Sequence, residues 1–329
     1  MADHPHHHHS HEHHHHAHDH HHHHHALPEM GPGNRLQRAF VLGLVLNGLI
    51  VVIQVIAGFW SNSLSLLADA GHNLGDVLGL LIAWGASWLV KRQASSRYTY
   101  GWRRSSILAA LLNAGLIFVA LGAIAVEALH RLQNPPPLQE NIVILVASLG
   151  ILFNGFTAWL FMKDQHDLNL KGVFLHMVTD ALVSLGVVLG AIAIMMTGWM
   201  WLDPVMSLGI AVLIGWGTWG LFQDSLSLLL DGVPNHLESR AVQTYLQELP
   251  QVMTIHDLHI WAISTTETAL SVHLVVENHS TDDAFLQTIQ EGLQHHFGIQ
   301  HSTIQLENGQ LSLDCSHHQC YPAVAPNKN

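Results

Sequence analysis

Six long apolar segments follow one another through the first two thirds of the chain. They cover approximately residues 37–60, 64–90, 105–129, 141–162, 172–197 and 204–222. A helix rises about 1.5 Å per residue, so about 20 apolar residues cross the roughly 30 Å hydrocarbon core of a bilayer. The pattern therefore predicts an α-helical membrane protein with six transmembrane helices. Asp203, directly before Pro204, is the predicted N-cap of the sixth helix.

The pattern changes at Asp231-Gly232-Val233-Pro234, where the apolar runs end. A helix capped by Asn235 is predicted to run to about Leu249. Alternating apolar residues then predict strands over 254–263 and 268–276, an amphipathic helix over 281–296 and a last strand over 301–306. This order, αββαβ, is typical of a small α+β domain. The predicted division is a tail at 1–34, a membrane domain at 35–230, a C-terminal cytoplasmic domain at 231–310 and a flexible tail at 311–329.

Composition supports a membrane protein, since 49% of the 329 residues are hydrophobic and only 11% are charged. Twelve basic residues and a formal net charge of −12 argue against a nucleic-acid partner. Basic residues gather on one side of the six predicted spans, which places both termini in the cytoplasm. These residues are Arg35, Arg38, Lys91, Arg92, Arg97, Arg103, Arg104, Lys163 and Lys171, against Arg131 alone in the opposite loops.

Both tails are rich in metal-binding side chains. More than half of the 31 histidines lie within residues 1–25, in an irregular tract that includes acidic residues. The tract is interpreted as a native, disordered metal-binding tail, with an expression tag as the alternative. The C-terminal tail carries Cys315, His317, His318 and Cys320. These side chains suit zinc but lack the regular spacing of a zinc finger, so adventitious metal capture is an equal alternative.

Ionisable residues interrupt the second apolar segment at Asp69, His72 and Asp76. One acid at the centre of a membrane helix costs roughly 2.5–3.5 kcal/mol, so its presence needs a reason. His72 and Asp76 are four residues apart and therefore lie side by side on one helix face. His176 and Asp180 repeat this spacing in the fifth segment. Two imidazoles and two carboxylates complete a tetrahedral site for a cation such as Zn²⁺.

Three further polar residues of the spans are candidate accessories to this site. Asp69 is either a supporting or entry residue, or an acid at a helix end that faces the cytoplasm or a neighbouring helix. Asn47 and Asn154 either orient ligands or line a pathway, or else hydrogen-bond between helices. The alternative for the two His-Asp pairs is a structural role, in which each pair makes a polar contact between helices and binds no metal.

Residues 63–76, with Asp69, His72 and Asp76, together with the matching His176 and Asp180, six spans and an αββαβ domain, resemble the cation diffusion facilitator family. The likeness is greatest to its bacterial and vesicular zinc exporters. It implies a homodimer in a bacterial inner (plasma) membrane that exchanges cytoplasmic Zn²⁺ for protons through these four residues. It also implies that His72 favours zinc over cadmium. No organic cofactor is expected, and Zn²⁺ is both the transported substrate and a candidate regulatory ligand.

The resemblance also points to metal sites outside the membrane. His256, His273 and Glu307 match positions that ligate zinc in relatives, whereas Gln305 replaces a histidine found in some of them. His236, His259 and His301 are candidate supplements, and ordinary exposed strand histidines are the alternative. The loop of residues 91–104 has no histidine or acid, so the metal site that some relatives carry there is not expected.

Two alternative functions are a metalloenzyme and a metal-gated sensor or channel. An intramembrane metalloenzyme would need an open zinc position and a general base, usually in the motif HExxH on a helix, and none of the six apolar segments contains that motif. A metal-gated sensor or channel would use the same ligands without proton coupling. A transporter, not an enzyme, is the interpretation that the pairing of two His-Asp motifs favours.

Overall fold

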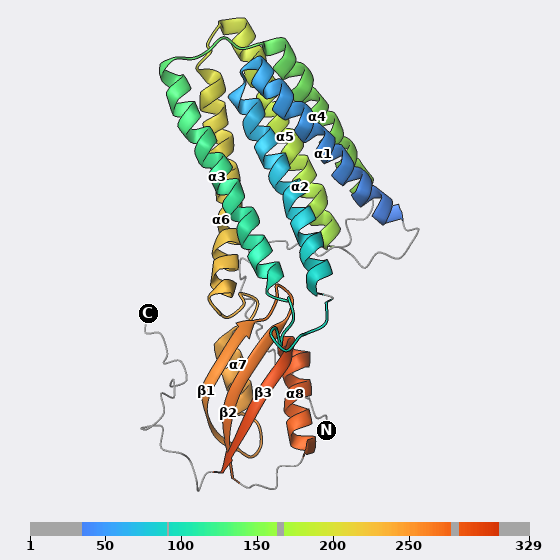
Figure 1. Cartoon of the computed structure of the whole chain (residues 1–329), viewed down its shortest axis with the longest axis vertical. Coiled ribbons are helices and arrows are strands. Elements are labelled where there is room, and N and C mark those ends of the chain that lie inside the picture. The colour runs from blue at the N-terminus through green and yellow to red at the C-terminus, as the bar shows by residue number, and fades with distance from the viewer. Residues whose placement is uncertain (1–34, 91, 163–167, 278–282, 309–329) are drawn as a thin grey trace, which may run out of the picture.

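The computed structural model describes residues 35–90, 92–162, 168–277 and 283–308. A bundle of long helices stands on a small domain of strands and helices, and the two are joined where the sixth helix ends (Figure 1). The tails at 1–34 and 311–329, with the histidine tract and the four Cys and His residues predicted to bind metal there, lie outside the described residues.

The predicted six helices are confirmed, and each is long and apolar enough to cross a membrane. Several extend beyond the predicted limits, because polar residues continue a helix past the end of its apolar run. Their bounds are α1 Arg35–Ser61, α2 Leu64–Val90, α3 Ser105–Gln133, α4 Glu140–Phe161, α5 Leu168–Thr197 and α6 Leu202–Leu229.

Helices distant in sequence lie side by side in the bundle. The helix α3 packs along α6 and α4 along α5, while α2 contacts α1, α3 and α6 and also meets α5 (Figure 1). Small residues allow the close packing of α1, α4 and α5, where Ala57, Ala147 and Ala191 are buried with Val187. This arrangement brings the polar stretch of α2 to face α5.

The connection between α1 and α2 is the tight hairpin that the short polar loop indicates. Asn62 adopts a left-handed conformation with φ of 58°, which turns the chain within the two residues between the helices. The backbone N–H of Ser63 then donates to the carbonyl of Gly58 at 3.0 Å. The hairpin sets the first turn of α2 at the end of the bundle away from the strand domain.

The prediction that Asp203 caps α6 is wrong. The helix α6 begins one residue before Asp203 and has no side-chain cap. Asp203 is buried and caps α2 instead, because the first N–H groups of α2 lack partners within their own helix. Its carboxylate accepts from the Leu64 N–H at 2.7 Å, the Ser65 N–H at 3.2 Å, the Ser63 hydroxyl at 2.9 Å and the Ser65 hydroxyl at 2.6 Å.

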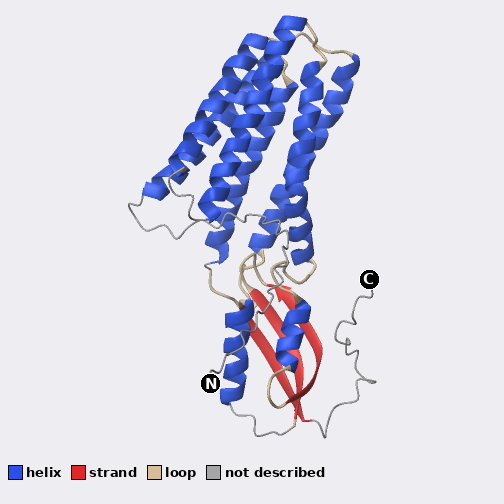
Figure 2. Cartoon of the chain, turned by 180° about the vertical axis from the view of Figure 1, so that it is seen from behind, coloured by secondary structure: helices blue, strands red, loops and turns tan. Residues whose placement is uncertain are grey.

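The C-terminal domain has the predicted αββαβ order. Its elements are α7 Ser239–Gln247, β1 Val252–Ala262, β2 Thr268–Val276, α8 Asp283–Phe297 and β3 Ile299–Asn308. In the sheet, β2 lies between antiparallel β1 and parallel β3. Both helices cover one face, as the views from front and back show (Figures 1 and 2). Their buried Val242, Leu246, Ile289 and Leu293 pack on the sheet.

The predicted cap at Asn235 is also wrong. The helix α7 begins at Ser239, after Glu238, because residues 234–237 form a turn in which the Leu237 N–H donates to the Pro234 carbonyl at 2.9 Å. The Asn235 amide instead donates to Asp224 of α6 at 2.6 Å. The residue therefore joins the end of α6 to the first turn of the domain.

Two arginines just before α3 connect the two parts of the chain. Arg103 lies 2.7 Å from Glu267 and 3.1 Å from His301, and Arg104 pairs with Asp231. The Ser106 hydroxyl also accepts from the Thr265 N–H at 3.1 Å. These contacts place the hairpin between β1 and β2 directly against α3.

Replacing Asp203 with alanine should lower the free energy of unfolding by about 2 kcal/mol, because it leaves two buried N–H groups of α2 without an acceptor. Thermal unfolding in detergent measures the loss. Asp203→Asn retains one acceptor oxygen and should cost less. Equal stability of Asp203→Ala and the unaltered protein would contradict the capping role.

Candidate metal centre

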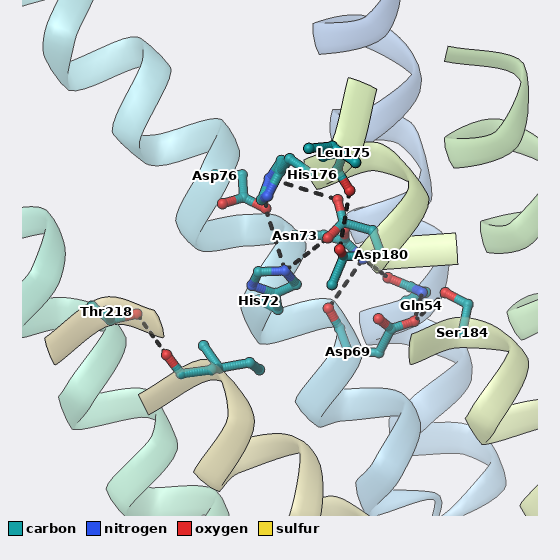
Figure 3. Close-up of polar contacts among 12 residues, drawn as sticks. Gln54, Asp69, His72, Asn73, Asp76, Leu175, His176, Asp180, Ser184 and Thr218 are labelled. Atoms are coloured by element: carbon teal, nitrogen blue, oxygen red, sulfur yellow. Dashed lines mark hydrogen bonds and ion pairs between the residues drawn. The ribbon is translucent and has the colours of Figure 1, made fainter. Parts of the chain in front are cut away.

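Two helices contribute the four polar side chains of the candidate transport site. His72 and Asp76 lie one turn apart on α2, and His176 and Asp180 lie one turn apart on α5. One ligand atom from each residue lies within 4.8 Å of all the others. Figure 3 shows His72, Asp76, His176 and Asp180 pointing toward one another from the two helices.

The shortest contacts in this group cross between the helices. The Nε2 atom of His72 is 3.0 Å from Asp180 Oδ1, and Nε2 of His176 is 3.2 Å from Asp76 Oδ2. Within each helix the corresponding distances are longer, 3.8 Å for His72 and Asp76 and 3.6 Å for His176 and Asp180. Each histidine therefore contacts both carboxylates, and neither helix alone forms the group.

Burial differs among the four side chains. Asp180 is fully buried, whereas the side chains of His72, Asp76 and His176 are 18%, 24% and 31% exposed. The two imidazole rings meet edge to face, with centroids 5.7 Å apart. One side of the group is thus closed by protein and the other is accessible.

This donor set fits a borderline divalent cation. Two imidazole nitrogens and two carboxylate oxygens are ligands that zinc takes in tetrahedral sites. Tetrahedral zinc bonds of about 2.0–2.2 Å place the ligand atoms roughly 3.3–3.6 Å from one another. The four nitrogen–oxygen distances of the group, 3.0, 3.2, 3.6 and 3.8 Å, are close to that spacing, so small side-chain movements would suffice. Burying four ionisable groups in an apolar bundle is costly, and a bound cation would offset that cost.

The predicted accessory residues lie outside this group. Asp69 is fully buried, and its Oδ2 accepts from the Gln54 amide at 2.6 Å and from the Ser184 hydroxyl at 2.9 Å. Asn47 of α1 and Asn154 of α4 are also buried. Within the described residues, Asn47 Oδ1 and Asn154 Nδ2 have no hydrogen-bond partner.

Sequence reasoning did not single out Gln54 and Ser184. Gln54 is a lone amide in the apolar run of α1, and Ser184 lies one turn beyond Asp180 on α5. The signal available for Ser184 was its spacing from Asp180. No local pattern connects Gln54 to Asp69, because the contact depends on how α1 packs on α2.

A second group of candidate ligands lies on the strand domain. His256 of β1 pairs in register with His273 of β2, and Glu307 of β3 lies near both. Glu307 Oε1 is 2.9 Å from His273 Nδ1, and its Oε2 is 3.4 Å from His256 Nε2. The sheet thus brings together the three residues predicted for the cytoplasmic site.

A bulge in β1 adds an acid at the edge of this second group. Asp257 has φ of 52°, and the register of β1 shifts between His256 and His259. Its carboxylate lies 3.0 Å from His259 Nε2 and 3.7 Å from His273 Nε2. His259 therefore reaches the group through Asp257. His301 contacts Arg103, and His236 is exposed in a turn, so neither belongs to the group.

Two family models match successive parts of the chain. Residues 40–230 match the family model described as cation efflux transmembrane domain, and residues 234–309 match that of the cation efflux protein, cytoplasmic domain. The chain belongs to the cation efflux family. This is the cation diffusion facilitator family that the motifs resemble, and the relatives described below are named as transporters, not enzymes.

Relatives of this cation efflux protein are similar over most of their length. The cadmium, cobalt and zinc/H(+)-K(+) antiporter of Bacillus subtilis is 36% identical over 78% of this chain and 84% of its own. The metal cation efflux system protein CzcD of Cupriavidus metallidurans is 38% identical over 84% and 88%. The zinc transporter ZitB of Escherichia coli is 35% identical over 85% and 89%. The chain is a multi-pass membrane protein and a cation efflux transporter.

Proposed function

We propose that this cation efflux protein exports Zn²⁺ in exchange for protons through His72, Asp76, His176 and Asp180. The observation that carries the proposal is the crossed contact of each histidine with the carboxylate of the other helix, at 3.0 and 3.2 Å. The site is complete only while α2 and α5 face each other. Rocking of α2 and α5 together would turn the complete site from one side of the membrane to the other.

The same contacts support coupling to protons. Where no cation lies between them, an imidazole nitrogen and a carboxylate oxygen approach to about 3 Å with a hydrogen between them, because two lone pairs repel. A cation can use both Nε2 atoms only after those hydrogens have left the contacts. Zinc and protons therefore compete for the same atoms, and protons arriving from the other side of the membrane would displace the ion.

The donor count disfavours the two alternative functions. A metalloenzyme keeps one zinc position open for water or substrate, whereas four donors here fill a tetrahedron. A channel conducts best when the ion binds loosely, and two imidazoles with two carboxylates bind zinc tightly. A site that loses protons when it binds zinc is better suited to a carrier that exchanges the two ions than to a channel or an enzyme.

The proposal extends to the assembly and its orientation. Both termini and the strand domain lie in the cytoplasm, and the membrane is the bacterial inner membrane. Two lines of support are the gathering of basic residues in the loops beside this domain and the family model for a cytoplasmic domain. Two chains form a homodimer, for which we take support from the dimerisation domain that the second family model represents.

Replacement of Asp180 by alanine should reduce zinc uptake into inside-out vesicles, driven by an imposed pH gradient, to the rate of vesicles without the protein. Asp180 contacts His72 directly, and its loss removes one of four ligands. Asp224→Ala removes a carboxylate of α6 that contacts Asn235 and should transport normally. Retained transport by a folded Asp180→Ala protein would refute the four-ligand site.

We also propose that His256, His273 and Glu307 bind zinc as a regulatory site. Its support is the short contact of Glu307 with both histidines across three strands. A metal held there would tie β1, β2 and β3 together and stiffen the sheet. The domain contacts α3 through Arg103, so its state could reach the membrane helices.

Zinc should slow backbone hydrogen exchange in β1 and β2 of the full chain by about tenfold or more, because a ligand of the closed state stabilises that state. Mass spectrometry of peptides separates this effect from metal bound elsewhere. His273→Ala should abolish the slowing, and His295→Ala, which alters an exposed histidine of α8, should not. Equal slowing in both variants would contradict this site.

A further inference from the structure

A second layer of buried polar residues lies next to the ligand group, toward the end of the bundle away from the strand domain. This layer, called the Asp69 layer, consists of Gln54 of α1, Asp69 and Asn73 of α2, and Ser184 of α5. All four side chains are fully buried. Asp69 precedes His72 by one turn, and Ser184 follows Asp180 by one turn. The layer thus repeats the meeting of α2 and α5 seen at the ligands.

Hydrogen bonds connect every member of the layer. Asp69 Oδ2 accepts from Ser184 Oγ at 2.9 Å and from Gln54 Nε2 at 2.6 Å. The other end of the Gln54 amide accepts from Asn73 Nδ2 at 3.2 Å, and Asn73 also donates to the Asp69 carbonyl at 3.1 Å. Asn73 follows the ligand His72 in the chain, so the layer and the ligand group share neighbouring turns of α2.

A glycine of α4 closes the layer from behind. A Cβ atom at Gly150 would lie 2.9 Å from Ser184 Oγ and 3.4 Å from Gln54 Nε2. No side chain fits there without moving these two groups. Four helices therefore confine the layer, and Ser184 and Gln54 have little room to shift relative to Asp69.

We propose that the Asp69 layer is a positioning element that sets the distance between α2 and α5, and thereby the size and metal preference of the ligand group. This inference rests on the proposed transport site. His72 and Asp76 move with α2, and His176 and Asp180 move with α5. A bond between the helices one turn away from the ligands limits how far the two halves can separate.

The physical consequence concerns the radius of the ion. Cd²⁺ is larger than Zn²⁺ and needs longer bonds to the same donors. A group held at a fixed width favours the smaller ion, whereas a group free to widen accepts both. Weakening the Asp69 layer should therefore help cadmium relative to zinc, and partners outside the ligand set commonly change metal affinity by about 10–100-fold.

The test measures initial rates of Zn²⁺ and of Cd²⁺ uptake by the full chain in proteoliposomes under one pH gradient. The ratio of kcat/KM for zinc to that for cadmium is the readout. Ser184→Ala removes the donor from α5 and should lower the ratio by about tenfold. If less of the variant is folded, the zinc and cadmium rates fall by the same factor and their ratio is unchanged. A changed ratio therefore reports on the positioning of the ligands and not on the stability of the protein.

The matched control is Ser207→Ala. Ser207 is also fully buried, but its hydroxyl donates to the Pro204 carbonyl within α6 and does not join α2 to α5. Its ratio should equal that of the unaltered protein. Gly150→Ala displaces Ser184 and Gln54 without removing a polar group, and it should also lower the ratio. It supplies the result if Ser184→Ala does not fold.

The outcomes separate the two proposals. An unchanged or higher ratio in Ser184→Ala or, if that protein does not fold, in Gly150→Ala overturns the positioning role, while the transport site stands if His176→Ala abolishes uptake of both metals. Full transport by His176→Ala overturns the transport site itself. A lower ratio in Ser207→Ala equal to that in Ser184→Ala also overturns the inference, because any buried serine would then have the same effect.

Discussion

Ionisable side chains buried among apolar helices must find partners, and in this protein the partners come from other helices. An unpaired charge in a bilayer is costly, and the surrounding lipid supplies no hydrogen bonds. His72 meets Asp180, Asp69 meets Ser184, and Asp203 meets the first turn of α2. These three contacts attach α2 to α5 and α6 at successive levels. Gln54 attaches α1 to α2 at the level of Asp69.

The contacts that hold α2 in place therefore also position the ligands that it carries. The Asp203 cap holds one end of α2, and the Asp69 layer holds the next turns. The ligand group comes after both and is the most exposed of the three levels, since the side chain of His176 is 31% exposed. Polar contacts that position the helix are thus buried, while contacts that exchange an ion are accessible. The C-terminal domain touches the bundle near the other end of α2, through Arg103 just before α3.

Local patterns predicted the six spans, the αββαβ order and both His-Asp pairs, because run length, alternation and a spacing of four residues are properties of one segment. The partners of buried polar groups were not predictable in the same way. Local pattern assigns Asp203 to its own helix and gives no sign of the roles of Gln54 and Ser184, because each contact depends on which helices pack together. The pairing of His72 with Asp180, closer than with Asp76, is of the same kind.

We propose above all that His72, Asp76, His176 and Asp180 hold one zinc ion between α2 and α5. Anomalous diffraction at the zinc edge, from crystals of the zinc-loaded full chain, tests it most directly. The account predicts one anomalous peak about 2.0–2.2 Å from Nε2 of both histidines and from one oxygen of each carboxylate. Retained His72–Asp180 and His176–Asp76 contacts with no peak between them, in crystals that show zinc elsewhere, would contradict it.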